Sequence, residues 1–240
     1  MESSAIADVL GATRAVLFDF DGPICDVFAG QPAHDVARHL AATLANCDRS
    51  LGDKAYGTED PMEVLRLAPQ GGEAALRRVE DELIKAEVSA VRSAGLPVSG
   101  AVAALEAAHA SGRKVAIVSN NSAACVRTFL LLHGLQHLVD AVVGRAPYQP
   151  EAMKPAPDSL LRASSELAVP LRDCTLIGDS VTDVEAARVT GGRSVGFANK
   201  AGKERALATA GADVVVTTML AVADALAHLR NRPDVTDTGR

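Results

Sequence analysis

The 240-residue chain carries 24 basic and 30 acidic residues, giving a formal net charge of −6, and 3% of its residues are aromatic. With no basic stripe and few rings on which bases could stack, this composition argues against nucleic acid as a partner. A hydrophobic content of 48% is typical of a globular domain, and no stretch reaches the roughly 18 apolar residues of a membrane span.

The first residues, Met1 to Ser4, lack the basic and apolar parts of a signal peptide. Four cysteines are scattered without a CxxC pair, which predicts free thiols in a reducing compartment: Cys25, Cys47, Cys125 and Cys174. We therefore expect a cytoplasmic protein with no membrane partner, acting as a monomer or a homodimer.

Short apolar runs rich in Val, Ile and Leu predict strands that are covered on both faces. They lie at residues 15–20, 114–119, 141–144, 174–178, 194–198 and 213–217. Helical patterns follow them at residues 101–112, 122–133, 156–168, 181–190, 201–210 and 219–230. This alternation predicts an α/β fold with a doubly wound, Rossmann-like parallel sheet.

A long segment without a good strand separates the first two predicted strands. Val36, Leu40 and Leu44 recur at helical spacing, a similar pattern runs over 76–90, and Asp60 before Pro61 marks another helix start. We interpret residues 27–95 as an inserted helical cap and residues 1–26 and 96–230 as the core, followed by a flexible tail at 231–240. An insert at this edge of a parallel sheet would lie above the ligand crevice and could act as a lid.

Acidic residues gather where two of the predicted strands end. Asp19 and Asp21 follow the first strand on the same side of the backbone, and Asp179 and Asp183 follow the fourth. Close carboxylates repel one another, so a cation must offset their charge. Because the nearby ligands are oxygens without His or Cys, a hard ion such as Mg²⁺ is favoured over zinc.

Polar residues at the other strand ends complete a possible phosphate site. The second strand ends at Ser119 and Asn120, and a helix opening near Ser122 offers N–H groups to an anion. Lys154 before Pro155 adds a positive charge. A carboxylate nucleophile surrounded by a metal, a lysine and amides is the equipment for phosphoryl transfer through an aspartyl-phosphate.

These residues form an ordered set of motifs: Asp19-Phe-Asp21-Gly22, Ser119-Asn120, Lys154-Pro155 and Gly178-Asp179-Ser180-x-x-Asp183. Over residues 14–230 the chain resembles the haloacid dehalogenase superfamily, in the group with a helical cap that includes phosphoglycolate phosphatase and β-phosphoglucomutase. The resemblance implies a phosphatase that acts on a small phosphorylated metabolite.

The resemblance also implies a role for each motif residue. Asp19 would attack phosphorus, and Asp21 would protonate the leaving oxygen and then activate water. The Asp19 and Asp179 carboxylates and the Asp21 main-chain carbonyl would bind Mg²⁺, with Asp183 acting directly or through water. The phosphate oxygens would be held by the loop at Gly22 and by Ser119, Asn120 and Lys154.

Several alternatives remain at this stage. Ser119 could be a helix cap and Asp183 a first-turn acid of a helix. The family usually has Thr after the glycine of the first motif, and Pro23 here removes a hydroxyl and an N–H from that loop. A single Lys before Pro is usually solvated, and Lys154 is assigned a role only because of its position in the ordered set of motifs.

Among the possible functions, a haloacid dehalogenase would share Asp19 but would not be expected to have an acid at position 21, so Asp21 argues against that activity. The cap lysines Lys54 and Lys85 lack a context that would mark phosphonate hydrolysis. A phosphomutase of the β-phosphoglucomutase type would keep all four motifs. A catalytically silent binding module of the same fold is the alternative outside enzymes. Polar candidates for substrate recognition on the cap are Arg49, Lys54, Tyr56, Arg77 and Arg78.

Overall fold

The computed structural model describes residues 2–230, and within them six strands form one parallel sheet of order β3-β2-β1-β4-β5-β6. The chain builds outward from β1 in one direction and then from β4 in the other. This confirms the predicted doubly wound α/β fold. The strands are β1 (Ala15–Phe18), β2 (Lys114–Val118), β3 (Ala141–Val143), β4 (Cys174–Gly178), β5 (Arg193–Phe197) and β6 (Val214–Val216).

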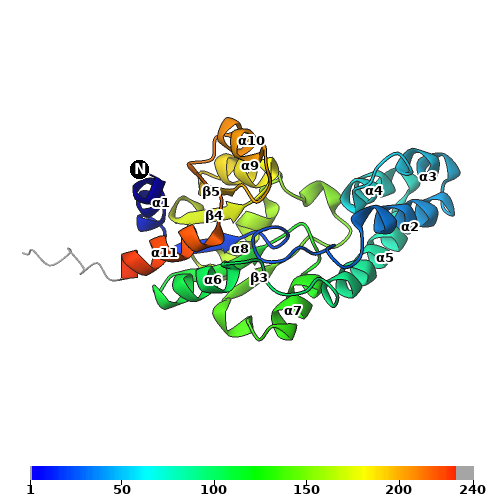
Figure 1. Ribbon diagram of the computed structural model, residues 1–240. Coiled ribbons are helices and arrows are strands. Elements are labelled where there is room, and N and C mark those ends of the chain that lie inside the picture. Colours follow the sequence, from blue (N-terminus) through cyan, green and yellow to red (C-terminus); the bar gives the residue numbers. More distant parts are fainter. Residues whose placement is uncertain (1, 231–240) are drawn as a thin grey trace, which may run out of the picture.

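Helices precede, interrupt and cover this sheet (Figure 1). Those of the core are α1 (Glu2–Gly11), α6 (Ala101–Ala110), α7 (Ala123–Leu132), α8 (Asp158–Leu167), α9 (Val181–Val189), α10 (Lys203–Ala210) and α11 (Met219–Arg230). Those between β1 and β2 that precede α6 are α2 (Ala33–Ala45), α3 (Arg49–Ala55), α4 (Pro61–Leu67) and α5 (Glu73–Val91). Short 3₁₀ turns are η1 (Ala68–Gly71), η2 (Gln136–Leu138), η3 (Pro150–Ala152) and η4 (Leu171–Asp173). Among the described helices, none is both long and apolar enough to cross a lipid bilayer.

Strand β1 is buried on both faces, as its unbroken apolar run predicts. Val16 and Phe18 pack into a cluster with side chains of α1, α6, α7 and α11, while Ala15 and Leu17 pack with those of α8 and α9. Successive side chains of a strand point to opposite faces, so each face of the sheet has its own helical layer.

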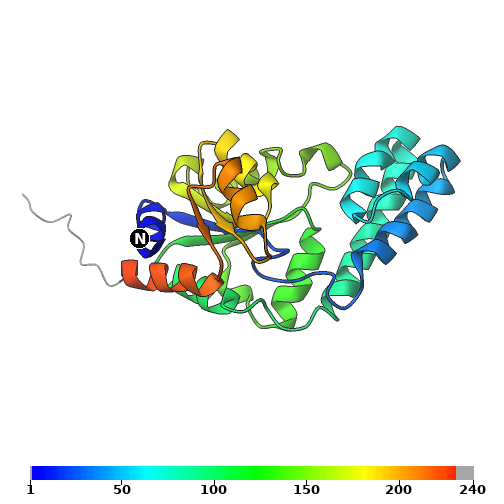
Figure 2. The same ribbon diagram turned by 45° about the horizontal axis from the view of Figure 1, so that its top comes forward.

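Helices α2 to α5 form a bundle at one end of the molecule, at the right of Figure 1, and the turned view in Figure 2 shows it projecting from the sheet. The bundle has its own buried cluster, which includes Leu40, Leu44, Val64 and Leu83. The last turns of α5 leave the bundle, and Ala90 and Val91 join the core cluster.

The structure differs from the predicted elements in two missed helices and in several element boundaries. Helix α1 was not predicted, although Ile6 and Leu10 are spaced for one buried face and are covered by the core. Helix α3 was also missed because it contains Gly52, a poor helix former whose missing side chain lets α3 approach Ala45 of α2. Helix α8 begins at Asp158, two residues later than predicted. The predicted flexible tail at 231–240 lies outside the described residues.

Candidate active site

The carboxyl ends of three adjacent strands bring the motif residues together. Strand β1 pairs with β2 on one side and with β4 on the other. Asp19 directly follows β1, Ser119 directly follows β2 and Asp179 directly follows β4. The chain reverses its direction of winding between β1 and β4, which is the place where doubly wound sheets open a crevice for ligands.

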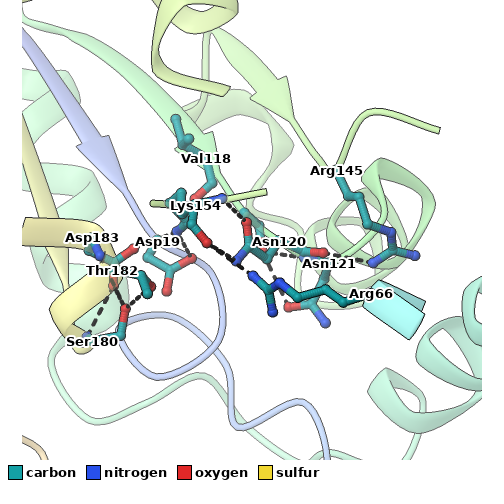
Figure 3. A network of polar contacts seen from close by, with 11 residues as sticks. Asp19, Arg66, Val118, Asn120, Asn121, Arg145, Lys154, Ser180, Thr182 and Asp183 are labelled. Carbon is teal, nitrogen blue, oxygen red and sulfur yellow. Dashed lines mark hydrogen bonds and ion pairs between the residues drawn. The ribbon is translucent and has the colours of Figure 1, made fainter. Parts of the chain in front are cut away.

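Lys154 joins the first and last motifs (Figure 3). Its Nζ lies 2.7 Å from Asp19 Oδ1 and 2.6 Å from Asp183 Oδ1, and it also donates to the Val118 carbonyl. Burial alone would lower the pKa of Lys154, but the Asp183 and Asp19 carboxylates raise it above its ordinary value. The lysine therefore stays charged and offsets part of the charge of the two buried carboxylates.

The Asp19 carboxyl group is buried between charges of both signs. Burial and the neighbouring Asp183 carboxylate raise the pKa of Asp19 above its ordinary value, against the lowering effect of Lys154. The structure thus places an acid where its charge needs further positive partners, which is the electrostatic setting of a metal ligand or a nucleophile.

A compact group of carboxylates offers such a place for a cation. Asp19, Asp179 and Asp183 each offer an oxygen, and these atoms lie within 4.8 Å of one another. The donors are all oxygens, which suits a hard divalent ion such as Mg²⁺. Two further side chains, which the sequence analysis did not identify, contact Asp179. Asn199 Nδ2 donates to Asp179 Oδ2 at 2.9 Å, and the Lys203 ammonium binds the same oxygen.

Asp183 serves the helix and the site at once. Its Oδ2 accepts the Ser180 N–H at 3.0 Å, and its own N–H donates to the Ser180 hydroxyl at 3.2 Å, which together form a capping box at the start of α9. Its Oδ1 faces Lys154. From the sequence, a first-turn acid of a helix is the alternative to a metal-shell role for Asp183. In the structure the contact with the helix start and the contact with Lys154 use different oxygens of the one carboxylate.

Asp21 lies outside the group of three carboxylates. Its Oδ1 accepts the Val27 N–H at 3.0 Å. Burial raises the pKa of Asp21 to about 6, although the Val27 hydrogen bond opposes the shift. A carboxyl group that exchanges its proton near neutral pH is suited to act as both acid and base.

Gly22 lets two motifs approach each other. It has a φ of 108°, and a Cβ atom on it would overlap the Asp179 carboxyl group. Only glycine combines that backbone conformation with the close approach. The first motif thereby sets the position of a carboxylate from the fourth.

The loop after β2 is hydrogen-bonded to the main chain of Lys154. The Asn120 side chain accepts the Lys154 N–H at 2.8 Å and donates to the Lys154 carbonyl at 3.3 Å. The Ser119 hydroxyl accepts the Asn121 N–H at 3.0 Å and donates to the Asn121 side chain at 3.2 Å. These contacts fix Ser119, Asn120 and Lys154 relative to one another at the edge of the cavity.

The start of α7 is not free for an anion in the way the sequence predicts. The Ser122 N–H donates to Glu87 at 2.9 Å, and the Cys125 N–H donates to the Ser122 hydroxyl at 3.2 Å. The expectation of unpaired N–H groups is therefore wrong for these two residues. A carboxylate of α5 takes the place that we assigned to phosphate, because it too is attracted to the amino end of a helix.

A buried ion cluster connects α5 with this loop and was also missed from the sequence. Arg145, just after β3, lies 2.8 Å from Glu80 and 2.8 Å from Glu87, and all three side chains are almost fully buried. The same guanidinium donates to the Asn120 carbonyl at 2.7 Å. Two acids on the apolar face of α5, seven residues apart, were the available signal, since buried acids require a partner.

Residues of all four motifs line a cavity of about 250 Å³, and the bundle contributes Asp60 and Met62, at the start of α4, to its lining. Asp60 is the helix cap that the sequence predicts, and its side chain accepts the Met62 N–H at 2.8 Å. None of the five predicted cap residues belongs to the described lining: Arg49, Lys54, Tyr56, Arg77 and Arg78. Arg77, for example, pairs with Glu73 instead.

Comparison with known proteins gives a consistent result. A family model described as haloacid dehalogenase-like hydrolase matches residues 13–191. The phosphoglycolate phosphatase of Xylella fastidiosa (strain 9a5c) is 30% identical over 184 residues, covering 74% of this chain and 77% of that protein. That of Salmonella typhimurium is 29% identical, covering 87% and 90%. The structure of β-phosphoglucomutase from Clostridium difficile superimposes with a TM-score of 0.63 at 21% identity, covering 87% of this chain and 92% of that one.

Proposed function

The chain belongs to the haloacid dehalogenase-like hydrolase family, and on that premise we propose that it is a Mg²⁺-dependent phosphatase of a small phosphomonoester. The relatives named phosphoglycolate phosphatase support the phosphatase activity. Phosphoglycolate, the substrate in those names, is one member of the class. The observation that carries the proposal is the contact of Asp19 with Lys154 at the centre of the acidic cavity.

Asp19 is the nucleophile in this proposal. Its position at the end of β1 is fixed by the sheet, and Lys154 holds one of its oxygens. Attack on phosphorus forms an aspartyl-phosphate and breaks the bond to the leaving oxygen, and Lys154 offsets negative charge between the two groups. Water then hydrolyses the acyl-phosphate, which restores the carboxylate and releases phosphate.

Asp21 carries the proton. In the first step it protonates the leaving oxygen of the alcohol, and in the second it takes a proton from the attacking water. A pKa of about 6 makes both protonation states accessible near neutral pH. The Val27 N–H orients the carboxyl group for this exchange.

The residues at the site fit a hard divalent cation. Oxygens of Asp19, Asp179 and Asp183 converge within 4.8 Å, and their charge exceeds what Lys154 and Lys203 supply. We propose that the Asp19 and Asp179 carboxylates and the Asp21 main-chain carbonyl bind Mg²⁺, with Asp183 assisting. When bound, the ion would neutralise charge on the transferring phosphoryl group.

We further propose that Gly22, Ser119, Asn120 and Lys154 surround the phosphate, supported by the contacts that fix these residues to one another. Residues 1–26 and 96–230 would form the catalytic core, and 27–95 the cap. Asp60 and Met62 bring the cap to the cavity, and a cap in this place would exclude water during phosphoryl transfer.

The test is a panel of phosphomonoesters with Mg²⁺, in which released phosphate is measured for the wild type, Asp19→Asn and the control Asp35→Asn. Asp35 is exposed on α2 and pairs with Arg38. We expect hydrolysis by the wild type and the control, loss of it in Asp19→Asn, and loss on chelation of the metal. Equal inertness of the wild type and Asp19→Asn across the panel would overturn the proposal.

A further inference from the structure

The charges around the cavity are unevenly distributed, and this bears on the part of the substrate that is not phosphate. Among the described residues that line the cavity, Lys154 is the only cation, and it is bound between Asp19 and Asp183. Lys203 lies outside the described lining and is bound to Asp179. Both lysines are therefore paired with the carboxylates that attack phosphorus or bind the metal in the proposed function.

The arginines beyond the cavity wall are engaged as well. Arg66 pairs with Glu63 at 3.0 Å. It also donates to the Lys154 carbonyl at 3.2 Å (Figure 3). Arg145 is neutralised by Glu80 and Glu87. None of these cations is available to pair with a second anionic group of a substrate without breaking a contact that it already makes.

Asp21 and Asp60 are the acids of the described lining with no cation among their recorded contacts, and of the two only Asp60 comes from the helical bundle. Asp19 and Asp179, the other two acids of the lining, are paired with lysines. Asp60 accepts only a main-chain N–H, from the first turn of α4, and its carboxylate remains on the cap side of the cavity.

We propose that Asp60 determines specificity by charge: the alcohol half of the substrate is neutral or cationic and carries no carboxylate. This inference rests on the proposed function, because it concerns the leaving group of the same reaction. A carboxylate brought beside Asp60 meets repulsion, and Lys154, the one cation of the described cavity lining, is already bound to Asp19 and Asp183, whereas a hydroxyl or an ammonium can interact with the Asp60 oxygens.

The size of the effect follows from the exposure of Asp60, which lies on the open, cap side. Charge pairs that remain in contact with water are worth about 0.2–1 kcal/mol. At the upper part of that range this corresponds to roughly a three- to fivefold change in relative kcat/KM for each unit of charge. Added salt should reduce it.

Three two-carbon phosphate esters of matched size test the inference: 2-phosphoglycolate with a carboxylate, 2-hydroxyethyl phosphate without a charge, and O-phosphoethanolamine with an ammonium. Their kcat/KM values are compared for the wild type, Asp60→Asn and Asp48→Asn. Asn is as good a helix cap as Asp, so α4 keeps its start. Asp48 is the matched control, since it caps α3 through Leu51 and lies outside the described lining.

We expect the wild type to prefer the ammonium and hydroxyl esters over 2-phosphoglycolate. Asp60→Asn should raise the ratio of 2-phosphoglycolate to 2-hydroxyethyl phosphate roughly three- to fivefold, and Asp48→Asn should leave it unchanged. A wild type that prefers 2-phosphoglycolate, or an Asp60→Asn ratio equal to that of the wild type, would overturn the inference.

Failure of the proposed function gives a different result. If the wild type and Asp19→Asn are equally inert on all three esters, the phosphatase proposal fails. The charge preference is then measured by calorimetric binding of the same three esters. In that measurement Asp60→Asn should raise the affinity for 2-phosphoglycolate relative to 2-hydroxyethyl phosphate by the same roughly three- to fivefold. A ratio of affinities equal to that of the wild type would overturn the inference.

Discussion

Replacing Arg145 by Met removes the only cation of a buried cluster while keeping most of the side-chain volume. The guanidinium and Glu87 have no exposed area, Glu80 has 2%, and both ion pairs measure 2.8 Å. Burial alone would lower the pKa of Arg145, but Glu87 and Glu80 raise it, so the group is charged. Without it, two carboxylates remain buried with no counter-ion.

Breaking a buried pair by removing one partner costs about 3–5 kcal/mol, because the remaining charge is left without compensation. We therefore expect Arg145→Met to lose that amount in urea unfolding at pH 7. For a protein of this size the melting temperature should fall by on the order of 10 °C. Arg38→Met is the matched control, since Arg38 forms an exposed pair with Asp35, and such pairs contribute about 0–1 kcal/mol.

The charge argument can be separated from lost packing. Combining Arg145→Met with Glu80→Gln and Glu87→Gln removes the uncompensated charges, so part of the lost stability should return. A loss below about 1 kcal/mol in Arg145→Met, or a further loss in the triple variant equal to the sum of the single changes, would refute the reasoning.

Two further predictions concern the catalytic cavity. Gly22→Ala should lower kcat/KM far more than the control Gly72→Ala. Both glycines have a positive φ, but a Cβ atom on Gly22 would overlap Asp179, whereas a Cβ atom on Gly72 would meet open space. Equal losses in the two variants would contradict the role of the close approach between Gly22 and Asp179. The kcat/KM for an alkyl phosphate, corrected for titration of the free ester, should fall as pH rises above about 6, because phosphoenzyme formation needs protonated Asp21. A profile flat from pH 5.5 to 8 would exclude Asp21 as the acid of that step.

Much of the fold follows from local sequence pattern. The apolar run before Asp19 predicts a central strand because both faces of β1 are covered, and the spacing of Val36, Leu40 and Leu44 predicts α2 because one face packs in the bundle. Helix α3 depends on tertiary packing, since Gly52 is tolerated only where α2 lies against it.

Part of the candidate site could likewise be predicted from the sequence, and part of it depends on packing. Asp19, Lys154, Asp179 and Asp183 could be brought together from sequence because the ends of parallel strands meet at one edge. Contacts such as that of Lys203 with Asp179 join segments of ordinary composition, and no motif marks them. Pairing across the fold, as for Arg145 with the acids of α5, is a property of packing that a single sequence does not encode locally.

The most direct measurement on the proposed mechanism is the site of covalent phosphorylation. Protein quenched in acid during turnover is reduced with borohydride, which converts an aspartyl-phosphate to homoserine, and the modified position is located by mass spectrometry of peptides. We expect homoserine at position 19 in the wild type and no homoserine at that position in Asp19→Asn. Phosphate release with no modification at position 19, or with the same modification elsewhere in Asp19→Asn, would contradict Asp19 as the nucleophile.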